Sequence, residues 1–225
     1  MPRSGAPLSN LWRSALGRAV TGQAVRAADD SAADTSDDVV FDGALAVLAR
    51  RGPRDATMDE VAAESGVSRA TLFRRYGGKD RVFELALVRD MRRFLEETAL
   101  RYETTVDPAE QVAETFVACI AWRDHVLLRG AEPARVAEFV ASLGAGSPSP
   151  LELAHGFVAA HLRAYQVDGR LPAADADLQA DMLIHLVLGY LASPRPVLDL
   201  DDPAALHAAA RTLLAPILLH PNTDG

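Results

Sequence analysis

Apolar residues recur every three or four positions along most of this chain, and that spacing most constrains what the sequence can fold into. It is clear near the start, at Val40, Ala44, Val47 and Leu48, and it returns in each later segment. Alternating β-branched runs bounded by turn pairs, which predict strands, do not stand out. We therefore predict an all-α protein of about nine helices.

Length and composition indicate a globular protein of the cytoplasm. The chain has 225 residues, 49% of them hydrophobic, which is enough to bury a sizeable core. Its single cysteine, Cys119, excludes an internal disulfide framework and a thiolate zinc cluster, and favours a reducing compartment. No apolar run suits a membrane span or a secretory signal. We expect no membrane association and no cofactor.

The net charge of −8 at first argues against a nucleic-acid partner. The charge is unevenly distributed, however. Residues 1–85 contain 12 basic and 12 acidic side chains, whereas residues 86–225 contain 11 and 19. Between Arg69 and Arg81, five basic residues face a single acid, Asp80. We interpret this stretch as a local basic focus.

The chain divides into three predicted parts. Residues 1–35 form a partly disordered extension, and the polar run Asp29–Asp38 is interpreted as a linker to the next part. Residues 36–85 form a DNA-binding domain whose first helix begins at Ser36 and ends at Gly52-Pro53. Residues 86–225 form a larger helical domain. The predicted helices from residue 79 onward are 79–104, 108–127, a shorter one at 133–143, 151–167, 175–192 and 203–219.

The stretch from Thr57 to Tyr76 has the spacing of a helix-turn-helix. Thr57 and Glu60 form a capping box that opens a short helix. Gly66 suits the tight turn that follows, and Ser68 caps the second helix. In such a motif the second helix enters the major groove of DNA. The predicted core residues of this domain are Val47, Leu48, Val61, Ala62, Val67, Leu72 and Tyr76.

Side chains of the second helix and of the next helix start are then available to a DNA duplex. Arginine reads guanine through two hydrogen bonds, and Thr71 offers a hydroxyl or a methyl group. Lys79 stands at a helix start, where free backbone N–H groups help to hold a phosphate. The residues that this geometry exposes are Ser68, Arg69, Ala70, Thr71, Arg74, Arg75 and Lys79.

These residues resemble the TetR family of bacterial transcriptional regulators. The resemblance covers residues 36–85 and rests on Thr57-x-x-x-Val61-Ala62-x-x-Ser65-Gly66-Val67-Ser68-x-x-Thr71-Leu72-Phe73-x-Arg75-Tyr76-x-Gly78-Lys79-Asp80. It implies that Thr57, Ser68, Arg75 and Lys79 hold phosphates, and that Arg69, Thr71 and Phe73 lie in or beside the base-reading face. The family most often has tyrosine at the position of Phe73, which lacks a hydroxyl to donate.

The resemblance also implies a small, apolar effector bound in the second domain. Part of the candidate lining falls on one helical face. Buried core is the competing interpretation for each residue. The candidate lining residues are Phe116, Cys119, Ile120, Trp122, Arg123, Phe139, Phe157, His161 and Tyr165. Asp181 and His185 stand one turn apart, but two ligands are too few to predict a metal site.

The last two long helices are apolar around much of their circumference, which suggests a surface for self-association. A two-fold homodimer also suits two recognition helices that read two half-sites. The predicted interface residues are Leu178, Met182, Leu186, Tyr190, Leu206, Leu213 and Ile217.

The sequence thus predicts a homodimeric transcriptional regulator that binds a double-stranded DNA operator and is a repressor released by its effector. It is not expected to be an enzyme, because a phosphate-binding glycine loop, a nucleophile elbow and a zinc-binding histidine pair do not stand out. Two alternatives remain open: a small α-helical enzyme, and an adaptor that keeps the fold but has lost DNA binding.

Overall fold

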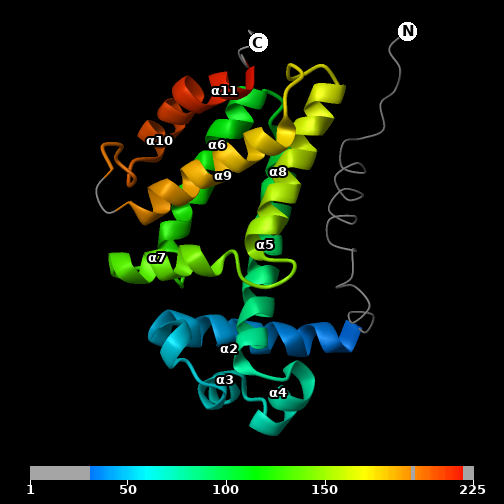
Figure 1. Cartoon of the computed structure of the whole chain (residues 1–225), viewed down its shortest axis with the longest axis vertical. Helices are drawn as coiled ribbons and strands as arrows, with labels where there is room; N and C mark the ends of the chain where they lie inside the picture. The colour runs from blue at the N-terminus through cyan, green and yellow to red at the C-terminus, as the bar shows by residue number, and fades with distance from the viewer. Residues whose placement is uncertain (1–30, 194–195, 220–225) are drawn as a thin grey trace. The chain divides into compact units, whose positions relative to one another are not determined.

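The computed structural model describes residues 31–193 and 196–219, and every regular element in these ranges is helical, as predicted. Residues 1–30 of the predicted extension therefore lie outside the described residues. The α-helices (Figure 1) are α2 (Ser31–Asp55), α3 (Met58–Ser65), α4 (Arg69–Tyr76), α5 (Lys79–Thr104), α6 (Pro108–Ile120), α7 (Pro133–Ser142), α8 (Pro150–Val167), α9 (Ala176–Ala192), α10 (Pro203–Ala209) and α11 (Ala215–Leu219).

The described residues form two compact units. The N-terminal unit comprises residues 31–93 and 123–153, and the C-terminal unit comprises residues 94–122 and 154–219. The divisions fall inside α5 and α8. The predicted domain boundary after residue 85 also falls inside α5, but residues 123–153, with α7, join the N-terminal unit.

Helix α2 begins at Ser31 and not at Ser36, so the predicted linker Asp29–Asp38 is helical from Ser31 onward. Val40, Ala44 and Val47 are completely buried, which is the helical spacing seen in the sequence. The break predicted at Gly52-Pro53 is present, because Gly52 has a φ of 75°. Glycine takes this left-handed conformation without steric cost, and the helix axis changes there.

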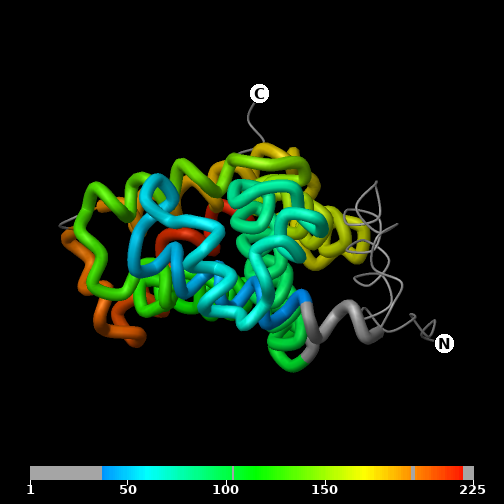
Figure 2. The backbone as a smooth tube through the Cα atoms, turned by 90° about the horizontal axis from the view of Figure 1, so that it is seen from below, coloured from blue at the N-terminus to red at the C-terminus, as the bar shows by residue number. Residues whose placement is uncertain are grey.

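Helix α3 packs against α2 and α4, and Figure 1 and Figure 2 show the three helices gathered together. The contact between α2 and α3 is close at Gly43. A Cβ atom at this position would lie 3.2 Å from the backbone nitrogen of Ser65. A small residue in α2 therefore allows the two backbones to approach.

Helix α6 is shorter than the sequence predicted. The predicted helix 108–127 was wrong beyond Ile120, where the chain enters a 3₁₀ turn, Ala121–Asp124. The N–H of Ala121 bonds to the carbonyls of Val117 and Cys119, which tightens the last turn. Leu127 and Leu128 continue the apolar pattern, but they are buried after the chain has left the axis of α6.

The core of the C-terminal unit consists of two clusters. One joins α8, α9 and α11 through residues such as Leu162, Tyr165 and Leu218. The other joins α6 to the stretch 203–214 through Phe116, Ile120 and Leu206. Between α10 and α11 the chain makes a π-helical turn, Ala210–Leu214, so the helix predicted over 203–219 is continuous but irregular.

In the part of the chain that the structure describes, no helix is both long and apolar enough to cross a membrane.

Candidate nucleic-acid interface

The start of α3 is fixed by the predicted capping box. The Thr57 hydroxyl accepts a hydrogen bond from the N–H of Glu60 at 3.2 Å, and the Glu60 carboxylate accepts one from the N–H of Thr57 at 3.0 Å. The Thr57 hydroxyl also donates to Glu60 at 3.0 Å. These bonds and the one from Arg51 hold the pKa of Glu60 below its usual value, the bond from Arg51 having the largest effect.

The turn between α3 and α4 has the predicted geometry. Gly66 closes α3 with a φ of 68°, in the left-handed region that favours glycine. The Ser68 hydroxyl accepts from the N–H of Thr71 at 3.2 Å and lies 2.9 Å from the Thr71 hydroxyl. The Ser68 and Thr71 hydroxyls are thus bonded to each other at the start of α4.

The inner side of α4 is held by Leu72, which is completely buried, as are Val47 and Val61. Ala62, Val67 and Tyr76, which the sequence placed in the same core, are only half-buried. Tyr76 instead donates its hydroxyl hydrogen to the Asp37 carboxylate of α2. Burial, followed by this bond, raises the pKa of Tyr76, so the hydroxyl keeps its proton.

The outer side of α4 presents an aromatic ring and cationic side chains. Phe73 is 40% exposed, and the Arg69 guanidinium lies 5.3 Å from the centre of its ring. Arg74 is exposed and, among the described residues, has no ion-pair partner. A ring with neighbouring arginines can contact both the base edges and the phosphates of a duplex.

The basic focus seen in the sequence is largely neutralised in the structure. Arg69 pairs with Asp59 at 3.0 Å, Arg75 with Asp37 at 3.1 Å, and Arg81 with Glu84 at 3.2 Å. Counting charges along 69–81 missed these pairs, because Asp37, Asp59 and Glu84 all lie outside that stretch. Exposed ion pairs contribute only about 0–1 kcal/mol, so a phosphate can replace the carboxylate.

Lys79 has a different environment from the one predicted. Its ammonium donates to the carbonyls of Pro53, Arg54 and Ala56, at 3.4, 3.1 and 2.9 Å. An ammonium has three N–H donors, and these carbonyls use all three. In this structure Lys79 stabilises the end of α2, and a phosphate would have to compete with these carbonyls for it.

The predicted effector-lining residues lie in different places. Phe116, Ile120, Phe157, His161 and Tyr165 are buried in the C-terminal unit. Cys119 and Trp122 belong to the same unit, whereas Arg123 and Phe139 belong to the N-terminal unit. The nine predicted lining residues are therefore divided between the two units.

Tyr102, which the sequence analysis missed, lies at the centre of the buried aromatic group. Its ring centre is 4.3 Å from that of His161, and its hydroxyl is 2.6 Å from the Thr115 hydroxyl. Burial lowers the pKa of His161 to about 3 and raises that of Cys119 to about 12. Both side chains are therefore uncharged at neutral pH, and the Cys119 thiol is a poor nucleophile.

The predicted dimer residues separate into exposed and buried groups. Leu178, Met182, Leu213 and Ile217 are exposed by 58, 53, 68 and 39%. Leu186 and Tyr190 are half-buried and pack against the α6 cluster. Leu206 is only 2% exposed, so its placement at an interface was wrong. Helical spacing did not show that this face of α10 is covered by α6.

The His185 ring lies 3.2 Å from the Asp181 carboxylate. Across the described residues, however, no group of three or more metal-ligating side chains comes together.

The helix-turn-helix residues can now be compared with known proteins. Residues 40–86 match the model of a family described as bacterial regulatory proteins, tetR family. This part of the chain is therefore similar to the tetR family. Two curated Mycobacterium tuberculosis proteins, both named as uncharacterized HTH-type transcriptional regulators, are 28% identical to it over 119 residues. That match covers 48% of this chain and 59% of each relative.

Solved structures share the fold. A TetR family repressor, AlkX, from Dietzia is 21% identical with a TM-score of 0.55, and the match covers 80% of this chain and 93% of that one. The regulator FadR from Bacillus subtilis, solved with stearoyl-CoA, is 15% identical with a TM-score of 0.56, covering 81% and 97%. The tetR-type fold thus extends beyond the matched residues 40–86.

Proposed function

We propose that this protein is a DNA-binding transcriptional regulator that inserts α4 into the major groove of a DNA operator. The observation that carries the proposal is the exposed outer face of α4, with Phe73 and Arg74, on a helix-turn-helix whose N-terminal caps are formed and whose inner side is buried at Leu72. The match of residues 40–86 to the tetR family supports the same function. The opposite side of α4 is fixed by Leu72, so the outer side chains are held in one orientation.

The proposed contacts differ in kind. Arg74 and Arg69 hold phosphates or read guanine, Arg69 after exchanging Asp59 for the DNA. Phe73 makes apolar contact, for example with a thymine methyl group. Arg75 exchanges Asp37 for a phosphate in the same way. Thr57, Ser68 and Thr71 act mainly through capping, with the Thr71 methyl group left for a base.

The test is DNA binding measured at a series of salt concentrations. Genomic fragments retained by the purified protein would be sequenced, and the shared sequence would serve as the probe in fluorescence anisotropy. Replacing Arg74 by alanine should weaken binding and reduce the slope of log K against log salt by about 0.9, the value for one phosphate contact. The Phe73→Ala variant should weaken binding with an unchanged slope.

The matched control is Arg93→Ala, because Arg93 is an exposed arginine of α5 outside the helix-turn-helix. This variant loses the same charge and should bind as the native protein does. Unchanged binding by Arg74→Ala and Phe73→Ala would contradict the proposed interface. Failure of the native protein to bind any fragment would favour the adaptor that has lost DNA binding.

We further propose a homodimer formed through the exposed apolar residues of α9, the π-helical turn and α11. Leu178, Met182, Leu213 and Ile217 supply that surface, and a two-fold dimer brings two copies of α4 to two half-sites. Such a regulator works in the cytoplasm, and release from its operator by a small effector makes it a repressor.

An effector site in the C-terminal unit would be apolar. Burial raises the pKa of Tyr102 and lowers that of His161, so both are uncharged at neutral pH, which suits an apolar ligand better than an ionic one. The stearoyl-CoA held by the Bacillus subtilis regulator is an example of a ligand with a long apolar part on this fold. A ligand regulates binding only when its affinity differs between the two conformations of the protein.

A further inference from the structure

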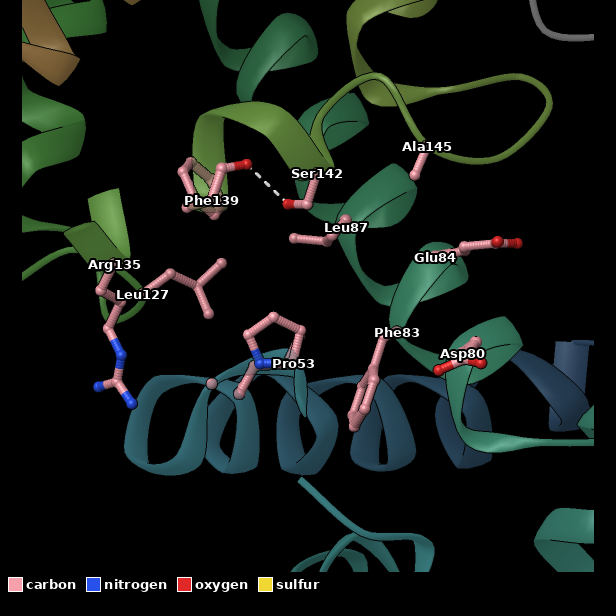
Figure 3. A pocket seen from close by; sticks show the side chains of 12 residues that line it. Pro53, Asp80, Phe83, Glu84, Leu87, Leu127, Arg135, Phe139, Ser142 and Ala145 are labelled. Carbon is pink, nitrogen blue, oxygen red and sulfur yellow. Dashed lines mark hydrogen bonds between the residues drawn. The ribbon is translucent and has the colours of Figure 1, made fainter. Parts of the chain in front are cut away.

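The N-terminal unit contains a cavity of about 180 Å³ that the proposed DNA interface does not use. It lies where the end of α2, the first turns of α5 and helix α7 meet (Figure 3). Its walls are mainly apolar, with Leu48, Phe83, Leu127 and Phe139 each no more than 9% exposed. Of the nine effector-lining residues predicted from the sequence, only Phe139 takes part.

The size of the cavity limits its occupant. An apolar cavity of about 150 Å³ in a protein holds one benzene molecule. A space of about 180 Å³ therefore suits a ligand with one ring or one branched chain and a small polar group.

The charged side chains that line the cavity differ between its ends. Asp80 and Glu84, one helical turn apart on α5, lie at one end, and Arg135 of α7 lies at the other (Figure 3). Glu84 pairs with Arg81 at 3.2 Å. Asp80 has no ion-pair partner among the described residues. The end of the cavity with the two carboxylates therefore has one negative charge, that of Asp80, without an ion-pair partner in the described part of the chain.

Arg135 is not available to bind an anionic ligand. Its Nη1 donates to the Ala49 carbonyl at 2.8 Å, and its Nη2 lies 3.3 Å from the Arg50 carbonyl. These bonds use the guanidinium to stabilise the end of α2, so an anionic ligand would have to displace them. Ser142 likewise donates its hydroxyl hydrogen to the Phe139 carbonyl at 2.6 Å. The polar groups left for a ligand are thus acceptors.

We propose that this cavity binds a small organic cation, an amine with one compact apolar group. The apolar group lies between Phe83, Leu127 and Phe139, and the ammonium lies at Asp80 and Glu84. This site is separate from the exposed face of α4 and from the buried aromatic group around Tyr102. Its occupation can be measured without DNA, so the proposal does not depend on the proposed regulatory function.

The test uses three probes of one shape: benzylamine, benzyl alcohol and benzoate. Binding to the full chain would be measured by isothermal titration calorimetry. Benzylamine should bind about tenfold more tightly than benzyl alcohol, because a charge-assisted hydrogen bond replaces a neutral one. Benzoate should bind most weakly. Equal affinity for the amine and the alcohol, or binding of no probe, would overturn the proposal.

Two double variants test where the ammonium group of benzylamine binds. The double variant Asp80→Asn, Glu84→Gln should lose the preference for benzylamine and keep its affinity for benzyl alcohol. The matched control is Glu96→Gln, Glu97→Gln, which removes two exposed acids of the same helix outside the cavity and should leave all affinities unchanged. Retention of the amine preference by the Asp80, Glu84 variant would place the cation elsewhere and overturn the proposal.

Variants that fill the cavity test whether the apolar group of the ligand binds there. The Ser142→Leu variant should weaken benzylamine binding about tenfold, and Ala145→Leu, on the exposed loop after α7, tests the same space if the first variant does not fold. Circular dichroism melting curves verify that each variant is folded. Unchanged binding by a folded filling variant would show that the probe binds outside this cavity.

Discussion

The two compact units expose different kinds of surface. In the N-terminal unit, α4 presents Arg69, Phe73 and Arg74, a cationic face around one ring. In the C-terminal unit, α9 presents Leu178 and Met182, which are more than half exposed and uncharged. A polyanion suits the first surface, and a second protein chain suits the other.

The two surfaces select their partners by different interactions. Arg69 and Arg75 of α4 are paired with acids of α3 and α2, so only a partner that competes for these two arginines gains their full charge. The apolar residues of α9 and α11 need no such exchange, because burial alone stabilises their contact. We therefore expect salt to weaken DNA binding strongly and self-association only slightly.

The largest expected effect is loss of the dimer. The double variant Leu178→Glu, Met182→Glu would put two charges into each side of an apolar interface, and burying an unpaired charge costs several kcal/mol. Light scattering at micromolar concentration should give a monomeric mass for this variant and a dimeric mass for the native protein. The control is Leu100→Glu, because Leu100 is also 59% exposed but lies on α5. A monomeric native protein would refute the dimer.

Removing the core of the helix-turn-helix should have the next largest effect. Leu72 is completely buried, and replacing a buried leucine by alanine costs roughly 2–5 kcal/mol. Urea denaturation should show this loss, and DNA affinity should fall although no exposed residue of α4 has changed. If DNA affinity falls while stability does not, Leu72 has a role other than packing.

Replacing Lys79 tests whether this residue stabilises the fold or binds a phosphate. The variant Lys79→Met leaves three carbonyls without a donor, and we expect it to lower the free energy of unfolding by about 1–3 kcal/mol. The slope of log K for DNA against log salt should stay the same. A slope reduced by about 0.9 without a loss of stability would instead assign Lys79 to a phosphate.

The smallest expected effect is a change with pH in the stability that Glu60 contributes. Its pKa is lowered in the folded protein, so its contribution to stability is present above the ordinary value of 4.5 and is lost as the pH falls through the lowered value. The difference in unfolding free energy between the native protein and Glu60→Gln should therefore shrink below about pH 4.5. A difference that does not change with pH would show that the carboxylate charge contributes nothing.

Local sequence determined the helix-turn-helix itself. The Thr57 and Ser68 caps, the Gly66 turn and the buried positions Val61 and Leu72 each depend on residues within a few positions of one another. Such short-range hydrogen bonds and helical spacing are readable from a single chain. The all-helical fold followed from the same periodicity.

The partners of the charged side chains were decided only by the tertiary structure. Lys79 bonds to carbonyls near residue 54, Arg75 pairs with Asp37, and Arg135 reaches carbonyls of α2. In all three cases the partners are 25 to 86 positions apart in sequence. A count of charges along the chain therefore overstated the basic focus, and neither the burial of Leu206 nor the cavity beside Asp80 was visible in it. Packing brings distant residues together, and the sequence pattern alone does not specify which faces meet.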